Sequence, residues 1–398
     1  MSIKSLFSKL TVITVLGQAL GAVINGLLIA LLARKLSDND FAIYIATVSL
    51  VTVFGSFTLG IRTITAHDYA LSRQRLTNGS SIFRSITILV GIFAGVWLAS
   101  SQIFRSYLQI PTIYLFIATS ILVASVLGSY ATGVLQGLRR FELWQKLILL
   151  TTVIQIPLIL FPVGRQLGVG YFLAILSIPS VCLFFFTFFI TKNSFVQPTP
   201  RFVKAAIGEG LSLGGVTLML QGPIFSSRLI DDSKISVTTA SMGLLFLTLC
   251  GLSSTMGSYL LPDHVMKDDQ TFSKETLKPH IIHTFPLLLA GVVLLAFGQD
   301  ILTFVFGDKI GSNIPRPLMV LIITSYALWS IGQSLLNACI NSLKGTLPYL
   351  LMGLAFFETS LLYLSRNNTY LFYSSFGIVA VLFLACILVS FEKITKNS

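Results

Sequence analysis

The chain has 398 residues, of which 54% are hydrophobic and only 11% are charged. A water-soluble globular protein of this length needs more polar residues than this to cover its surface. The composition therefore indicates a membrane protein. The net charge of +12 could suggest a nucleic-acid partner, but Lys and Arg also gather in the cytoplasmic loops of membrane proteins. We therefore attribute the charge to membrane topology and expect no nucleic-acid partner.

Apolar windows of about 20 residues recur along the whole chain, and a helix of that length crosses roughly 30 Å of hydrocarbon. The predicted fold is an all-α polytopic membrane protein with about twelve transmembrane helices. The expected spans are 11–33, 41–61, 85–103, 112–134, 147–163, 171–190, 209–228, 237–261, 284–298, 317–340, 346–364 and 370–391.

The distribution of basic residues predicts the orientation of these spans. With the N-terminus inside, the predicted cytoplasmic segments hold about twice as many Lys and Arg residues as the outer segments. Basic residues hold loops on the cytoplasmic side. Both termini are therefore predicted to be cytoplasmic.

A polar segment at 191–208 divides the windows into two groups of six, because Pro198 and Pro200 keep it from continuing a helix. The predicted domains are an N-terminal six-helix bundle at 1–190, a cytoplasmic linker at 191–208 and a C-terminal six-helix bundle at 209–398. Each half starts and ends inside, so the expected pseudo-repeat is parallel, about an axis along the membrane normal.

Two outer loops support this repeat. The segment ARKLSDND at 33–40 aligns without gaps with SRLIDDSK at 227–234, so Arg34 and Arg228 take equivalent positions. Both basic residues lie on the side of the membrane where the charge rule expects few of them. They are therefore candidates for a role beyond topology.

Glycines recur at the same distance before each of these arginines, at Gly21 and Gly215, and the seventh span also contains Gly222 and Pro223. Matched Gly and Pro interruptions in corresponding helices point to a transport site. We hypothesise a gating role for these four residues. The alternative is close helix packing, for which glycines are common in transmembrane helices, as in Gly91-x-x-x-Gly95 and Gly133-x-x-x-Gly137.

Sequence motifs for enzymes occur without the context that they need. The G-x-S-x-G pattern at 210–214 lies in a predicted membrane helix and not in a strand-to-helix turn. The chain contains no Walker A and no HExxH sequence. No catalytic residue, cofactor site or metal site is predicted, and the chain is not expected to be an enzyme.

Asp38-Asn39-Asp40 has two interpretations. Paired acids in the first outer loop of some membrane glycosyltransferases can hold a divalent metal through oxygen ligands. The loop here is short, and Ser37, Asp38 or Asp40 can instead cap the second helix by accepting hydrogen bonds from its first main-chain N–H groups. Capping is the preferred interpretation.

Glu358 is the clearest charged residue inside a predicted span. A charge near the bilayer centre costs about 2.5–3.5 kcal/mol on insertion scales, so such a residue faces a cavity or a partner. Two roles stay open. Glu358 either couples transport to an ion or to substrate, or it joins two helices as a protonated, hydrogen-bonded carboxyl group.

Four segments in order resemble one family. They are LLARKLSDNDFAIYIATVSL at 31–50, GVLQGLRRFELWQKLILL at 133–150, LTFVFGDKI at 302–310 and LNACINSLKG at 336–345. On a twelve-span frame these segments resemble the polysaccharide repeat-unit flippases, or O-antigen transporters, which share a superfamily with the multidrug and toxic-compound extruders. The resemblance covers nearly the whole chain.

The resemblance implies a multi-pass protein of the bacterial inner membrane that serves lipopolysaccharide or capsule biosynthesis. It implies transport of an undecaprenyl-pyrophosphate-linked oligosaccharide from the cytoplasmic to the outer leaflet, between two six-helix bundles that alternate in access. The implied partners are this polyprenyl-linked glycan, the lipid bilayer and other polysaccharide assembly proteins. No cofactor is implied.

A pyrophosphate that crosses apolar space needs cations in place of water, and Arg matches phosphate oxygens with two parallel hydrogen bonds. We hypothesise that Arg34 and Arg228 meet it near the outer mouth, and that Arg62, or Arg139 and Arg140, meet it inside. In the alternative for Arg34, its side chain anchors the first helix at the headgroups and pairs with Asp38 or Asp40.

Other functions remain alternatives. A drug or cation antiporter of the same superfamily would need intramembrane carboxylates, and only Glu358 fits. A polytopic glycosyltransferase or repeat-unit polymerase would carry a substantial outer loop, and the longest one expected here is only 299–316. A structural scaffold is a further alternative.

Overall fold

The computed structural model describes most of the chain. The described residues are 24, 26, 27, 29–71, 80–160, 168–191, 202–230, 235–244, 274–307, 315–339 and 347–397.

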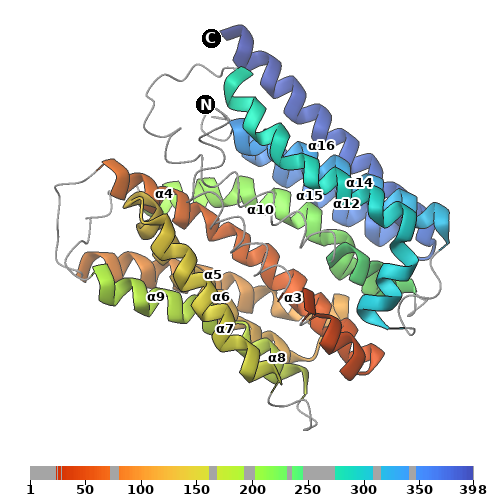
Figure 1. The fold of residues 1–398 in the computed structure, drawn as a ribbon, viewed down its shortest axis with the longest axis horizontal. Helices are drawn as coiled ribbons and strands as arrows, with labels where there is room; N and C mark the ends of the chain where they lie inside the picture. The colour runs from red at the N-terminus through yellow and green to blue at the C-terminus, as the bar shows by residue number, and fades with distance from the viewer. Residues whose placement is uncertain are drawn as a thin grey trace. The chain divides into compact units, whose positions relative to one another are not determined.

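The described residues form helices and no strand. The helix that ends at Lys35 carries no label, and the labelled elements follow it along the chain (Figure 1). They are α3 (Asp38–Phe57), α4 (Leu59–Leu71), α5 (Ser80–Leu108), α6 (Thr112–Gly137), α7 (Phe141–Leu160), α8 (Val169–Ile175), α9 (Ile178–Thr191), α10 (Phe202–Ser226), the short η2 (Ser227–Leu229), α12 (Lys274–Phe306), α14 (Arg316–Cys339), α15 (Leu347–Leu364) and α16 (Thr369–Asn397).

The predicted spans overlap these helices wherever the residues are described, but the bounds differ: α12 extends beyond 284–298 at both ends, and the span predicted at 41–61 is divided between α3 and α4. Six stretches are long and apolar enough to cross a membrane, namely Asp38–Ala66, Ser85–Leu108, Thr112–Gly137, Phe141–Leu160, Val169–Ile190 and Thr369–Val389. The protein is therefore an all-helical, multi-pass membrane protein. The full count of twelve helices and the orientation of the termini stay predictions.

The chain divides into two compact units, which we call unit 1 and unit 2. Unit 1 comprises 1–6, 18–46 and 218–398, and unit 2 comprises 7–17 and 47–217. The predicted domain boundaries stay predictions, since most of the expected linker lies outside the described residues. Within that segment α10 begins at Phe202, because Pro200 is the last helix breaker before a continuous run of helix-compatible residues.

In unit 2, α6 is the central helix and packs against α4, α5, α7, α8 and α9. Its core includes an aromatic cluster in which the ring of Trp97 lies 5.1 Å from that of Phe54. The indole N–H of Trp97 donates a hydrogen bond to the carbonyl oxygen of Leu115, at 3.0 Å. This bond fixes α5 against α6, because a buried donor is costly to leave unmade.

In unit 1, α14 packs between α12 and α16, and α15 also packs on α16. Stacked and edge-to-face rings fill the α14–α16 contact: Trp329 lies 4.3 Å from Phe383, and Tyr326 lies 4.9 Å from Phe376. Such pairs add roughly 0.5–1.5 kcal/mol each beyond the area that they bury.

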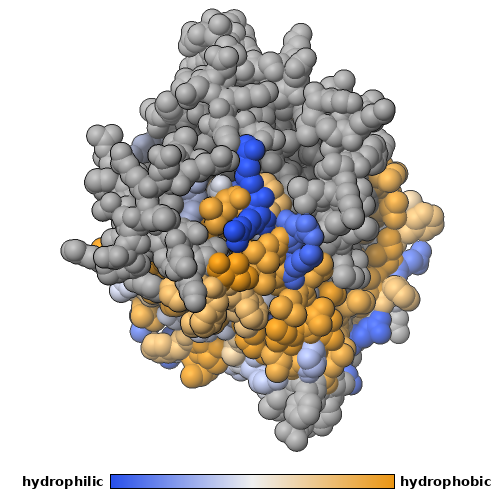
Figure 2. Space-filling model, turned by 60° about the vertical axis from the view of Figure 1, so that its left-hand side comes forward, coloured by the Kyte–Doolittle hydropathy of each residue, from blue (hydrophilic) through white to orange (hydrophobic). Residues whose placement is uncertain are grey.

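Large apolar side chains lie on the outside of the helices. Figure 2 shows apolar residues over much of the described surface on one face. Exposed examples include Phe304 at 80%, Leu364 at 76% and Phe189 at 67%. Contiguous apolar surface of this kind is unfavourable in water and favourable against lipid tails.

Ser37 caps α3, as the capping interpretation predicts. Its hydroxyl accepts a hydrogen bond from the main-chain N–H of Asp40 at 3.2 Å and donates one to the Asp40 carboxylate at 2.9 Å. The acidic side chains Asp38 and Asp40 lie in the first turn, where they also complement the positive end of the helix dipole. No metal-ligand cluster of His, Cys, Asp or Glu occurs among the described residues.

Two of the predicted glycine motifs have different roles. A Cβ atom on Gly133 would lie 2.6 Å from the carbonyl oxygen of Arg62, and one on Gly137 would lie 2.5 Å from the Cβ of Tyr69. These two glycines allow α4 to approach α6, so the packing interpretation is confirmed there. A Cβ on Gly91 or Gly95 would meet nothing within 4 Å, so these glycines pack against none of the described residues.

Candidate functional site

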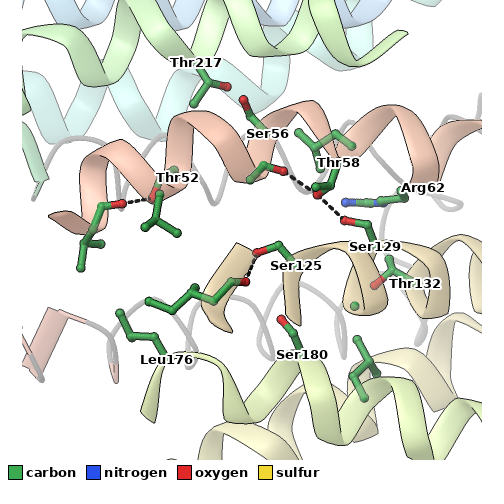
Figure 3. Close-up of a pocket in the computed structure, with 17 residues that line it drawn as sticks. Thr52, Ser56, Thr58, Arg62, Ser125, Ser129, Thr132, Leu176, Ser180 and Thr217 are labelled. Atoms are coloured by element: carbon green, nitrogen blue, oxygen red, sulfur yellow. Dashed lines mark hydrogen bonds between the residues drawn. The ribbon is translucent and has the colours of Figure 1, made fainter. Parts of the chain in front are cut away.

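A cavity of about 530 Å³ lies within unit 2, between α3, α4, α6 and α9 (Figure 3). This volume is typical of pockets for small ligands, roughly 300–1,000 Å³. The polar side chains that line it are Thr52, Ser56, Thr58, Arg62, Ser125, Ser129, Thr132, Ser180 and Thr217. No Asp or Glu occurs among the described residues of the lining.

Four of the hydroxyl groups come from regularly spaced positions on two helices. On α3, Thr52 and Ser56 are one helical turn apart, and on α6 the same is true of Ser125 and Ser129. Residues at this spacing share one face of a helix. The two faces oppose each other in Figure 3, where a hydrogen bond of 2.8 Å joins the hydroxyls of Thr58 and Ser129.

Two helices are interrupted at the cavity. The α3–α4 helix breaks at Thr58, and the α8–α9 helix breaks at 176–177. Irregular backbone at membrane depth is tolerated where it lines a cavity and where its polar groups have partners. At the second break, the amide of the buried Gln155 donates a hydrogen bond to the carbonyl oxygen of Ile175 at 3.1 Å.

Arg62 is the charged side chain of the cavity lining. Its Nε donates a hydrogen bond to the side-chain oxygen of Gln136 at 2.9 Å, and its guanidinium lies over the Trp144 ring, 5.3 Å from the ring centre. Both contacts hold the guanidinium in a fixed orientation, and the ring attracts its charge. A fixed cation beside a hydroxyl-lined cavity can bind an oxygen-rich or anionic ligand.

Arg139 and Arg140 are exposed in the turn that follows α6. The N–H of Arg139 bonds to the carbonyl of Gln136, and the N–H of Arg140 bonds to that of Leu135. This is a Schellman ending, in which Arg139 takes the left-handed position with φ 56°. Gln136 thus links Arg62 to this turn, so three of the predicted substrate-binding arginines lie around the same end of α6.

Arg34 lies elsewhere, in unit 1, where it donates a hydrogen bond to the main-chain carbonyl of Phe304 near the end of α12. A cation at this position complements the negative end of a helix. No ion pair joins Arg34 to Asp38 or Asp40 among the described residues, so the alternative pairing is not observed. The hydroxyl of Ser37 forms hydrogen bonds with the carboxylate and the main-chain N–H of Asp40, and Arg34 donates to the carbonyl of Phe304 instead.

Arg228 lies in η2, also in unit 1, and donates a hydrogen bond of 3.4 Å to the side-chain oxygen of Asn39. Arg34 and Arg228 therefore contact different partners. A role of either arginine at an outer substrate mouth stays a proposal.

Glu358 in α15 is 1% exposed, and neither of its carboxylate oxygens has a hydrogen-bond partner among the described residues. A buried carboxylate without a partner is costly. A Cβ on Gly222 of α10 would lie 3.7 Å from its Oε1. The Glu358 carboxyl group thus lies beside Gly222, on the side of α10 where this residue has no side chain.

The predicted gating residues are only partly described. Gly21 lies outside the described residues, and Gly215 is buried within α10. α10 continues through Gly222 and Pro223 and ends at Ser226, so these residues do not end the helix, and their gating role stays a prediction. The ring of Pro223 removes one main-chain hydrogen bond, but the turns on either side hold the helix together.

Sequence reasoning missed the hydroxyl-lined cavity. The signal was present as Thr and Ser residues at helical spacing inside apolar windows, at 52 and 56 and at 125, 129 and 132. It was easy to overlook, because a single Ser or Thr in a membrane helix satisfies itself by bonding to its own backbone.

The fold can be compared with those of proteins of known structure. No family model and no curated protein sequence matches the chain. Over 97% of this chain and 95% of the other, it is similar to the outward-facing conformation of a multidrug resistance MATE family transporter of the MOP superfamily, with a TM-score of 0.65 and 12% identity. Over 98% of this chain and 90% of the other, it is similar to the lipid II flippase MurJ in an inward closed conformation, with a TM-score of 0.66 and 14% identity.

A third similar structure is a MOP superfamily transporter from Pyrococcus furiosus, described as having a binding pocket of reverse polarity. It covers 97% of this chain at 13% identity, with a TM-score of 0.59. The fold is similar to the folds of these three transporters. At these identities the similarity concerns the fold alone, and one fold can carry different functions, as the descriptions multidrug resistance transporter and lipid II flippase indicate.

Proposed function

We propose that this protein flips an undecaprenyl-pyrophosphate-linked oligosaccharide repeat unit from the cytoplasmic to the outer leaflet of a bacterial inner membrane by alternating access. One observation carries the proposal. The cavity of unit 2 contains a fixed cation, Arg62, and several hydroxyl groups, and no acidic side chain occurs among its described lining residues. Such a site suits a glycan attached to an anionic phosphate group.

The arrangement of basic residues supports a place for the pyrophosphate. Arg62, Arg139 and Arg140 gather around the end of α6 that was predicted to be cytoplasmic. Substrate would first meet these arginines on the cytoplasmic side, and Arg34 and Arg228 would meet it after transport. The similarity to the MurJ fold makes a lipid-linked cargo compatible with the architecture, while the substrate itself rests on the chemistry of the cavity.

A multidrug or cation antiporter is the alternative, and the same cavity argues against it. A cationic drug needs carboxylates, and the charge in the cavity lining is positive. Glu358 is buried in unit 1 and does not line this cavity.

Glu358 supports a further part of the proposal, the coupling of transport to an ion gradient. A neutral carboxyl group without a described partner can lose and regain a proton when its surroundings change between two conformations. The membrane potential alone would contribute about 2.3 kcal/mol per charge per 100 mV to outward movement of an anion. The two driving forces are compatible.

The experiment that tests the function is deletion of the gene in its host, followed by mass spectrometry of undecaprenyl-pyrophosphate oligosaccharides and labelling with an impermeant glycan probe. The proposal predicts complete single repeat units trapped on the inner leaflet. Single units already on the outer face would indicate a polymerase, and truncated units a glycosyltransferase. An unchanged lipid pool with altered drug sensitivity would instead support the antiporter.

A further inference from the structure

Four of the cavity hydroxyls donate their hydrogen atoms to main-chain carbonyl groups. A Ser or Thr hydroxyl has one proton to donate and two lone pairs that accept. Thr52 donates its proton to the carbonyl of Val48 at 2.8 Å, and Ser125 donates to the carbonyl of Ile121 at 2.8 Å. Each of these hydroxyls therefore offers lone pairs to the cavity.

The hydroxyls near the break between α3 and α4 also donate their hydrogen atoms to main-chain carbonyl groups. Ser56 donates to the carbonyl of Val53 at 2.6 Å, and Thr58 donates to the carbonyl of Gly55 at 2.5 Å. Since Thr58 has no second proton, Ser129 is the donor in the bond of 2.8 Å that joins them. Much of the polar lining of the cavity consequently accepts hydrogen bonds and does not donate them.

We propose that the hydroxyls of Thr52, Ser56 and Ser125 in this cavity bind the sugar portion of the substrate by accepting hydrogen bonds from the sugar, and that these hydroxyls do not bind the pyrophosphate. The inference rests on the proposed function and refines it. A pyrophosphate carries several negative charges and needs donors, whereas the lone pairs of Thr52, Ser56 and Ser125 would repel it. A sugar ring presents several O–H donors and no net charge.

Cations are a poor match for the same cavity. Oxygen lone pairs alone could coordinate a hard cation, but the guanidinium of Arg62 lies in the lining and raises the energy of a second positive charge. The remaining fit is a neutral sugar that is rich in hydrogen-bond donors and whose attached anionic group is directed toward Arg62. In this arrangement the glycan lies along the α3 and α6 hydroxyls, and its phosphate end lies toward the arginines that follow α6.

The test compares two lipids on the purified full-length protein in nanodiscs. The probes are undecaprenyl pyrophosphate without sugar and undecaprenyl pyrophosphate bearing the repeat-unit oligosaccharide of the host. Dissociation constants are measured for the variants Thr52→Val and Ser125→Ala. Each removes one acceptor oxygen at nearly constant shape.

Two matched controls carry the same kind of intrahelical bond and do not line the cavity. Ser120 on α6 donates to the carbonyl of Ile117 at 2.6 Å, and Thr63 on α4 donates to that of Leu59 at 3.1 Å. The control variants are Ser120→Ala and Thr63→Val. A general effect of losing an intrahelical hydroxyl would appear in these controls as well.

We expect each cavity variant to weaken binding of the sugar-bearing lipid by about 3- to 10-fold and to leave binding of the sugar-free lipid unchanged. The controls should change neither. Equal weakening for both lipids would assign the cavity hydroxyls to the pyrophosphate, and no weakening would mean that these hydroxyls take no part in recognition. Either result overturns the inference.

The wild-type protein separates this inference from the proposed function. If it binds and flips the glycan lipid while the variants show no sugar-dependent loss, the inference fails alone. If it neither binds nor flips that lipid, the proposed function fails, and the inference fails with it.

Discussion

The side chain of Arg34 donates a hydrogen bond to the main-chain carbonyl of Phe304, 270 positions later in the chain. The bond lies next to Gly307, which ends α12 in a left-handed conformation with φ +86°. The N–H of Gly307 bonds to the carbonyl of Thr303 at 2.8 Å, a common helix ending. Arg34 thereby ties the end of the first helix to the end of α12.

We expect Arg34→Ala to lower the free energy of unfolding by roughly 1 kcal/mol. The variant removes the hydrogen bond from a charged donor to the carbonyl of Phe304, which lies at the negative end of the α12 dipole. Thermal unfolding in detergent measures this loss. The exposed neighbour Lys35 is the control, and Lys35→Ala should leave stability within about 0.5 kcal/mol of the wild type.

Transport by the Arg34→Ala variant separates the structural role of Arg34 from its proposed role at the outer substrate mouth. We expect the double variant Arg34→Ala and Arg228→Ala to impair flipping at unchanged protein amount, if both arginines meet the pyrophosphate. Normal flipping by this variant would assign Arg34 to the support of α12 alone.

Gly133→Ala should destabilise the protein by about 1–3 kcal/mol, since the new methyl group would overlap the backbone of α4. A Cβ there lies 2.6 Å from a carbonyl oxygen and 2.7 Å from the Cβ of Thr65. Gly95→Ala is the matched control: it meets no atom within 4 Å and should be neutral or slightly stabilising in a helix. Fluorescence-detected size exclusion after heating compares the two, and equal melting would contradict this account of the α4–α6 contact.

Arg62→Lys should weaken binding of both the sugar-bearing and the sugar-free lipid, in contrast to the hydroxyl variants. Lys keeps the charge but loses the planar fork that Gln136 and Trp144 hold in place. We expect a loss of roughly 10-fold in affinity, measured with the same nanodisc assay. Wild-type affinity in Arg62→Lys would indicate that charge without orientation is sufficient.

Glu358→Gln mimics a permanently neutral carboxyl group. If Glu358 carries the coupling proton, the variant should fold normally and lose the dependence of flipping on an imposed pH gradient, because it can no longer exchange a proton. Proteoliposomes with an imposed gradient provide the measurement. Glu142→Gln is the control, since Glu142 is exposed and pairs with Lys146 at 2.7 Å. An unchanged gradient dependence in Glu358→Gln would leave Glu358 with a packing role only.

The positions of the helices were predictable from the sequence, because long apolar windows and their Pro and polar boundaries determine where a membrane helix can lie. The cap at Ser37 followed from the same local rules. Glu358 was recognisable as an exception within an apolar run. Each of these features depends on residues that are close together in the sequence.

Features that depend on distant residues were not predictable. The break in α3–α4 occurs at Thr58 without any proline, while Pro223 lies in a continuous helix. Surrounding contacts decide such cases, since Thr58 finds its partner in Ser129, far along the chain. The carbonyl partner of Arg34 is likewise invisible in the sequence, because every residue carries a main-chain carbonyl.

The interruption at Thr58 also has a mechanical consequence for the cavity. A continuous helix bends only by stretching its main-chain hydrogen bonds. At Thr58 the regular pattern is already broken, and the main-chain N–H of Thr58 bonds at 3.0 Å to the carbonyl of Gly55, which also accepts the Thr58 hydroxyl. Bending at Thr58 would therefore stretch fewer regular helix hydrogen bonds than bending elsewhere in this cavity wall, so we expect any change in the width of the cavity to occur at this position.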